Sequence, residues 1–208
     1  MNNHKSKVYK NILELKTIES IKEFYKNQPE QHAEVGIVNK NLEYHIPENF
    51  IYKTMNPILN EIIGNDHEFD TGSYKSSKKP YILHVDSRKQ QDLYPDCMSF
   101  GSKTIRHNKA VLIPLVEGDN FRTITFKVWS DFNPSYEQMV QNSTDENNLV
   151  LTDFDHDKNF SLIKKLPIDI DYRHTLGDIL VWDRNQWHIS NNFAKFGLVK
   201  QFLIFFIV

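Results

Sequence analysis

Residues 177–192 read GDILVWDRNQWHISNN, a short apolar run between two polar turns, followed by a histidine. Gly177 and Asp178 favour a turn, and Ile179–Trp182 has the composition of a buried strand. A second turn at 183–185 then leads into a strand that begins near His188. The stretch therefore predicts two consecutive strands, with a histidine early in the second one.

Strand-like composition extends well beyond this stretch. Residues rich in Val, Ile, Phe, Thr and Trp recur at 81–86, 110–116, 121–129 and 199–208. Turn-forming residues separate them at 117–120, 133–135 and 142–148. Many short strands joined by loops predict a mainly β domain, a sandwich or a barrel, with helices packed outside it.

The N-terminal part has a different pattern. Ile12, Leu15, Ile18, Ile21 and Phe24 recur at a spacing of three and predict a helix with one apolar stripe. A second helix is expected from Asn56, which can cap it, to Gly64, which can end it. We expect one domain over 1–208, in which a helical part (about 1–65) packs on a β core (about 66–208).

The composition is that of a soluble globular protein. The 208 residues include 25% charged and 39% hydrophobic ones, and the net charge of −2 gives no reason to expect a nucleic-acid or membrane partner. No apolar run has transmembrane length, the N-terminus lacks a signal-peptide pattern, and Cys97 is the single cysteine. A cytoplasmic protein is expected, and the oligomeric state stays open.

His84-Val85-Asp86 is the first motif that can carry chemistry. Side chains alternate along a strand, so His84 and Asp86 are expected on the same face, where they can bind one ion. Such a pair is common by chance in a chain with nine histidines. It gains weight when it is combined with His188.

Together, His84, Asp86 and the segment 177–192 resemble the 2-oxoglutarate and iron(II)-dependent oxygenase superfamily, in which a His-x-Asp motif is followed much later by a distal histidine. His188-Ile189-Ser190 and the nearby asparagines are most similar to its phytanoyl-CoA dioxygenase-like branch, and a prolyl-hydroxylase-like branch is the other candidate. The resemblance covers about residue 81 to the C-terminus. It implies a double-stranded β-helix (jelly roll, cupin-like) and an oxygenase, usually a hydroxylase, whose second substrate is a small molecule or a side chain.

The resemblance also implies the cofactors, which are Fe(II), 2-oxoglutarate as co-substrate and O2. His84, Asp86 and His188 are the expected metal ligands, and two imidazoles with one carboxylate leave positions open for the keto acid and dioxygen. Lys200 is the expected partner of the distal carboxylate of 2-oxoglutarate. Lys127, with Thr123 and Thr125 on the same predicted strand, is a second candidate.

Several alternatives stay open. A cupin-like metal isomerase or a non-catalytic ligand-binding module would share the fold, although Asp183 and Asn185 replace the Pro and Gly of the second cupin motif. His32-Ala33-Glu34 is a rival His-x-acid pair, and residues 153–157 resemble the start of a calcium loop. The second substrate is expected to enter over the loops at 87–102 and 132–165.

Overall fold

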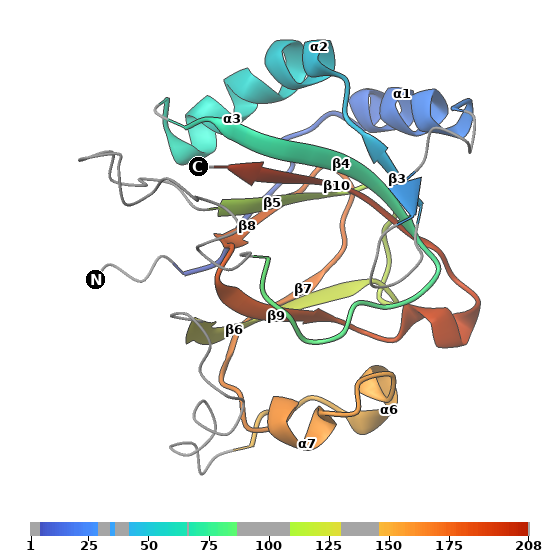
Figure 1. Cartoon of the computed structure of the whole chain (residues 1–208), viewed down its shortest axis with the longest axis vertical. Helices are drawn as coiled ribbons and strands as arrows, with labels where there is room; N and C mark the ends of the chain where they lie inside the picture. Colours follow the sequence, from blue (N-terminus) through green and yellow to red (C-terminus); the bar gives the residue numbers. More distant parts are fainter. Residues whose placement is uncertain are drawn as a thin grey trace.

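The computed structural model describes residues 5–28, 34–35, 42–65, 67–86, 109–129 and 146–207. Within them, two antiparallel β-sheets face each other, and helices lie outside both (Figure 1). The larger sheet has the order β1 (Lys7–Tyr9), β8 (Ile179–Asp183), β5 (Lys109–Pro114), β10 (Lys200–Ile207), β4 (Phe69–Ser77), β3 (Leu42–His45) and β2 (Glu34–Val35). The smaller sheet has the order β7 (Ile168–Arg173), β6 (Arg122–Trp129) and β9 (Gln186–Ser190). The mainly β fold predicted from the sequence is confirmed.

The central strands of the larger sheet are buried on both faces, which explains why their sequences are apolar without interruption. On β5, Val111 and Ile113 belong to the core beneath the N-terminal helices, whereas Ala110 and Leu112 belong to the core between the sheets. This division follows from the alternation of side chains along a strand. The site described below lies on the inter-sheet side.

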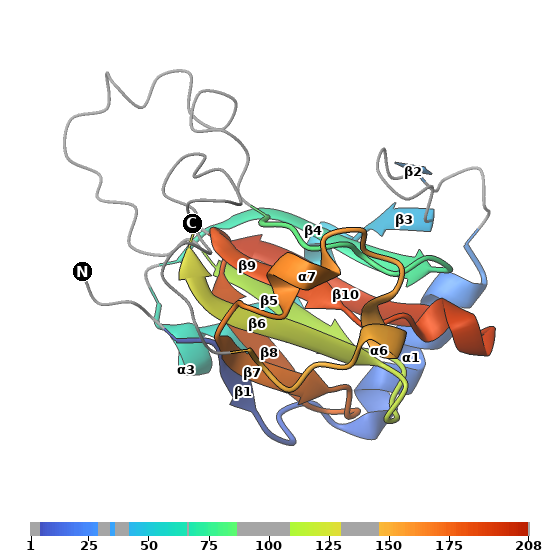
Figure 2. The ribbon, with the colours of Figure 1, turned by 90° about the horizontal axis from the view of Figure 1, so that it is seen from below.

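Helices cover the outer face of each sheet. Over the larger sheet lie α1 (Leu15–Lys26), α2 (Glu48–Phe50), a π-helical turn (Ile51–Met55) and α3 (Asn56–Ile63). Over the smaller sheet lie α6 (Leu151–Phe154) and α7 (Phe160–Ile163), as Figure 2 shows. A 3-10 turn (Phe193–Phe196) connects β9 to β10. Among the described residues, no helix combines the length and the apolar character that crossing a membrane requires.

The stripe predicted for the first helix is wrong at Leu15 and Phe24, whereas Ile12 lies before the helix and packs against the core. Ile18 and Ile21 are buried, but Leu15 and Phe24 are exposed, and Tyr25 takes the last core position. Residues three apart on an α-helix are rotated by about 60° from one another, so Leu15 and Phe24 lie on opposite sides. The step of four from Ile21 to Tyr25 keeps the stripe on the core.

The N-terminal part also contributes strands. β1 pairs with β8 and β3 pairs with β4, so the boundary near residue 65 does not separate helices from sheet. β4 was not predicted, because Phe69–Ser77 is mostly polar or small. It runs closely beside β10, and a side chain at Gly72 would meet the Phe205 ring at 2.9 Å.

Candidate metal centre

The segment 81–86 meets β9 through one isolated β-bridge between His84 and His188. The backbone N–H of each histidine donates to the carbonyl of the other, at 3.0 Å both ways. This double hydrogen bond brings the two rings to a centroid separation of 4.2 Å although 103 residues lie between them in the chain. The continuous strand expected over 81–86 is not formed: His84 makes its only β-bridge, although Tyr81 also accepts a hydrogen bond from the backbone N–H of Ser190 at 3.2 Å.

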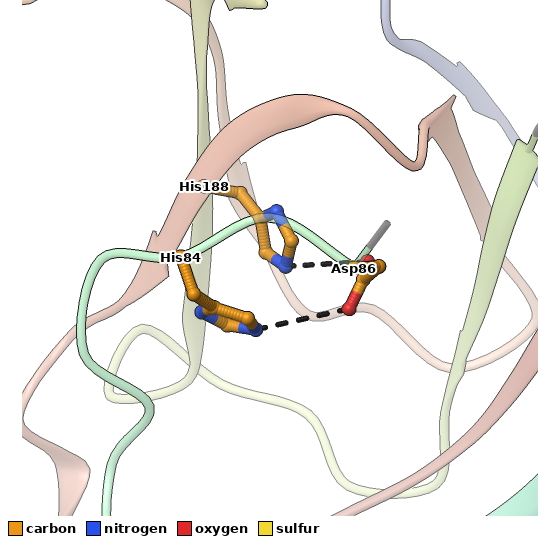
Figure 3. Close-up of side chains that lie close together, drawn as sticks. All are labelled: His84, Asp86 and His188. Carbon is orange, nitrogen blue, oxygen red and sulfur yellow. Dashed lines mark ion pairs between the residues drawn. The ribbon is translucent and has the colours of Figure 1, made fainter. Parts of the chain in front are cut away.

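Asp86 completes the group (Figure 3). Its backbone N–H donates to the carbonyl of Arg184 at 2.8 Å, which ties the end of the segment to the turn between β8 and β9. Its carboxylate oxygens lie 3.8 Å from Nε2 of His84 and 3.4 Å from Nε2 of His188. The three candidate ligand atoms lie within 4.8 Å of one another, so one ion can contact all three.

Backbone hydrogen bonds orient both rings for metal binding. Nδ1 of His84 lies 2.7 Å from the carbonyl oxygen of Ile82, and Nδ1 of His188 lies 3.0 Å from that of Gln186. A carbonyl only accepts, so each Nδ1 carries a hydrogen, and Nε2 is the ring nitrogen that the neutral form can offer to a metal. Burial and the adjacent His188 lower the pKa of His84 to about 4, which keeps that ring neutral at physiological pH.

These residues fit a divalent metal. Oδ2 of Asp86 is buried and accepts no hydrogen bond from the residues that the structure describes. It lies 3.4 Å from Nε2 of His188, and a divalent cation between the two atoms would give both a partner. Two neutral imidazoles and one carboxylate form the ligand set typical of non-haem iron(II) sites.

A buried carboxylate outside this group positions it. Asp157 is 3% exposed, and its Oδ2 accepts the backbone N–H of Leu83 at 2.7 Å, immediately before His84. Its Oδ1 accepts the N–H of Asn159 at 2.8 Å. In the sequence, Asp157 belongs to the stretch 153–157 that resembles a calcium loop. In the structure, its carboxylate instead accepts hydrogen bonds from two backbone amides.

The three residues open into a pocket with a cavity volume of about 70 Å³. Its walls combine apolar side chains from both sheets with a few polar ones, including Leu112, Trp182, Phe202, Ile204, Tyr81, Lys75, Thr123 and Lys200. Lys200 is 2% exposed, and its ammonium donates to the Arg122 carbonyl at 3.2 Å and to Oγ1 of Thr123 at 3.0 Å. No carboxylate forms an ion pair with Lys200 within the described part of the chain, and burial lowers its pKa to about 7. A buried cation of this kind is stabilised by an anionic ligand.

Comparison with models of protein families gives no match, and neither does comparison with curated protein sequences. Solved structures do match. They include the carbocyclase SnoK from nogalamycin biosynthesis, described as non-haem and α-ketoglutarate-dependent (9% identity, TM-score 0.62, covering 99% of this chain and 80% of that one). HygX from Streptomyces hygroscopicus with nickel and 2-oxoglutarate bound is 11% identical, with a TM-score of 0.62, and the match covers 99% of this chain and 83% of that one. A prolyl-4-hydroxylase from Pseudomonas putida is 9% identical, with a TM-score of 0.54, and the match covers 98% of this chain and 92% of that one.

The chain has the fold of the 2-oxoglutarate and iron(II)-dependent oxygenases. At these identities the likeness establishes the fold, and the resemblance inferred from His84, Asp86 and residues 177–192 is confirmed at that level. Within this fold, His84, Asp86 and His188 come together in the wall of a pocket lined by strands of both sheets.

The other predicted site residues of this oxygenase fold lie elsewhere. Lys127 is exposed and does not line the pocket. Thr125 pairs with His188 across β6 and β9, but its hydroxyl lies 2.8 Å from that of Ser6 and is fully buried outside the pocket wall. Lys195 is exposed and pairs with Asp153 at 3.1 Å.

Some predictions fall outside the described residues. They concern His32, the segment 87–102 and most of the first half of the loop 132–165.

Proposed function

We propose that this chain is an iron(II) and 2-oxoglutarate-dependent oxygenase that oxidises, usually by hydroxylation, a second substrate. One observation carries the proposal: a two-histidine, one-carboxylate group and a buried lysine without a carboxylate partner in the described chain line the same pocket. The first suits iron(II), and the second suits the distal carboxylate of a keto acid.

Each residue has a distinct task. His84, Asp86 and His188 would hold the metal. The Nδ1 hydrogen bonds of the two histidines orient their rings with Nε2 towards the metal position. Iron(II), when bound, supplies the activation of dioxygen, with coordination positions left open for the co-substrate. Lys200 would orient the co-substrate by binding the carboxylate at its far end.

The apolar walls complete the site. Trp182 lies against the His188 ring, with centroids 5.0 Å apart, and Leu112 and Ile204 line the pocket beyond it. These side chains exclude water from the region between the metal and Lys200, which strengthens electrostatic contacts there. We propose a small molecule or a protein side chain as the second substrate.

Lys200 also distinguishes this function from the alternative of a cupin-like isomerase or a binding module. Those functions need a metal or a ligand pocket, but they give no reason for a buried ammonium in the pocket wall. An oxygenase that uses a keto dicarboxylate needs such a cation.

Anaerobic titration tests the proposal. Iron(II) is added to the full chain and then 2-oxoglutarate, and the visible metal-to-ligand charge-transfer band of a chelated keto acid is recorded. A saturable band that disappears in the His188→Ala variant is expected. Stoichiometric iron binding without such a band would refute the co-substrate and favour the isomerase or binding module.

A further inference from the structure

A second buried histidine is linked to the Lys200 ammonium by two hydrogen bonds through Thr123. His174 follows β7 and is 2% exposed, and its Nε2 lies 3.0 Å from Oγ1 of Thr123. The same hydroxyl oxygen accepts a hydrogen bond from the Lys200 ammonium at 3.0 Å. The backbone fixes the histidine, whose N–H donates to the Phe121 carbonyl at 2.8 Å and whose carbonyl accepts from Gly118 at 3.1 Å.

The chemistry of the three groups fixes the direction of the hydrogen bonds. An ammonium only donates, so Oγ1 of Thr123 must accept from Lys200. The threonine hydroxyl then donates its own hydrogen, and Nε2 of His174 is the acceptor at hand. His174 is therefore neutral, with its hydrogen on Nδ1.

The surroundings of His174 favour this neutral form. Its Nδ1, which carries the hydrogen, is buried without a hydrogen-bond partner in the described residues, and a second proton would have to go to Nε2, which accepts from Thr123. Burial, and then the charge of Lys200, hold the pKa of His174 well below its ordinary value.

We propose that His174 is a positioning residue that acts through Thr123 to fix the Lys200 ammonium, leaving one of its three N–H groups for a carboxylate in the pocket. The inference rests on the proposed function, in which Lys200 binds the co-substrate. Two ammonium hydrogens are used by the Arg122 carbonyl and by Thr123, and the acceptor behind Thr123 strengthens the second bond. Without His174 as acceptor, the hydrogen bond from the Lys200 ammonium to Thr123 would be weaker, and the charged form of Lys200 would be less favoured.

Other titratable and charged groups surround this relay. Those near its two ends, within the described residues, are Tyr81, Lys75, His84, Asp86 and His188 on the pocket wall, Tyr172 stacked on His174 at 5.5 Å, and Arg122. Burial raises the pKa of Tyr172, so it stays neutral, and the Arg122 guanidinium pairs with Asp153 and Asp171. None of them replaces His174 as the acceptor for Thr123.

The first test follows the lysine itself. The full chain carries 15N at the lysine Nζ atoms, and the Lys200 signal, assigned by its loss in Lys200→Arg, is titrated with pH in the metal-free protein. We expect a midpoint near the pKa of about 7 in the unsubstituted chain. Thr123→Val and His174→Phe should lower it by about one pH unit, which corresponds to one hydrogen bond to a charged group.

Conservative variants provide the controls. His174→Gln, whose side-chain oxygen can accept from Thr123, should restore the midpoint, and Thr123→Ser should keep it. Tyr172→Phe alters the ring stacked on His174 but leaves the relay intact, so its midpoint should equal that of the unsubstituted chain. A merely structural effect of His174 would not distinguish Gln from Phe in this way.

The second test measures 2-oxoglutarate affinity through the charge-transfer band at pH 7.5. Thr123→Val and His174→Phe should raise the Kd about tenfold and leave iron(II) affinity unchanged. Should His174→Phe fail to fold, the comparison of Thr123→Val with Thr123→Ser decides. An unchanged Lys200 midpoint in folded Thr123→Val overturns the inference. Failure of the unsubstituted protein to bind 2-oxoglutarate overturns the proposed function instead, while the lysine titration still judges the relay.

Discussion

Replacement of Lys200 by methionine removes the buried charge and keeps a flexible chain of similar length. The ammonium has two hydrogen bonds to the protein and no carboxylate partner in the described residues, so the distal carboxylate of 2-oxoglutarate would be its counter-ion. One hydrogen bond between charged groups is worth about 2 kcal/mol, and Lys200→Met should therefore raise the Kd for 2-oxoglutarate about 30-fold. Pyruvate has the chelating keto-acid end but no distal carboxylate, and its affinity should be nearly equal in both proteins.

The Kd for 2-oxoglutarate should also depend on pH, by an amount that follows from the pKa of Lys200. With a pKa of about 7, about nine-tenths of Lys200 is charged at pH 6 and about one-tenth at pH 8. Because the carboxylate binds the charged form, the Kd of the unsubstituted protein should rise about tenfold between these two values. Lys200→Met has no such group, and the guanidinium of Lys200→Arg stays charged throughout, so the Kd of both variants should be flat.

The assay is anaerobic titration of the charge-transfer band at saturating iron(II), with 2-oxoglutarate and pyruvate in parallel. The low pKa of His84 keeps that ligand neutral over the whole range, so it adds no slope of its own. Equal 2-oxoglutarate affinity in the unsubstituted protein and Lys200→Met would refute the role of Lys200. A pH-independent Kd in the unsubstituted protein would refute its lowered pKa.

Three further predictions concern the metal site and stability. Alanine at any of the three metal-ligand positions should weaken iron(II) binding at least about 100-fold in calorimetric titration, whereas alanine at the exposed His45 should leave it unchanged. Asp157→Ala frees the amide of Leu83, so iron affinity should fall about tenfold and Tm should drop, with a smaller loss in Asp157→Asn, which keeps one acceptor oxygen. Lys200→Met should raise Tm at pH 6, because the folded state lowers the lysine pKa from 10.5 to about 7 and so disfavours the charged form. This advantage should shrink as pH rises from 7 towards 10.5, where the unfolded lysine also loses its proton, and an advantage that grew with pH would contradict the reasoning.

Much of the fold could be predicted because its central strands are buried on both faces and are therefore apolar. β5, β6, β8 and β10 were expected within two residues of their observed ends. β4 was missed because its composition is polar, and β7 was missed although Ile168, Ile170 and Tyr172 alternate with polar residues in the pattern typical of a strand.

The site residues also fall into two groups, those that the sequence pattern marks and those that only the fold brings together. His84, Asp86 and His188 carry a recognisable spacing, and Lys200 stands at the start of a strand in which Gln201 is the only other polar residue. His174 has no motif, and the calcium-loop resemblance at Asp157 pointed to another role, because their partners are a threonine and a backbone amide brought close by folding. Such pairings depend on tertiary contacts that one sequence does not display.

The isolated bridge between His84 and His188 has a consequence for amide hydrogen exchange. The amide of each histidine donates to the carbonyl of the other, so a single opening of the segment breaks both hydrogen bonds and exposes both amides together. Their protection factors should be equal and lower than those of amides inside β5 or β10, and a metal bound by both side chains should slow the two by the same factor. At a free metal concentration of 100 times its Kd, that factor is about 100 if opening releases the metal. Two amides far apart in the chain thus report metal occupancy directly, with no need for turnover or for a known second substrate.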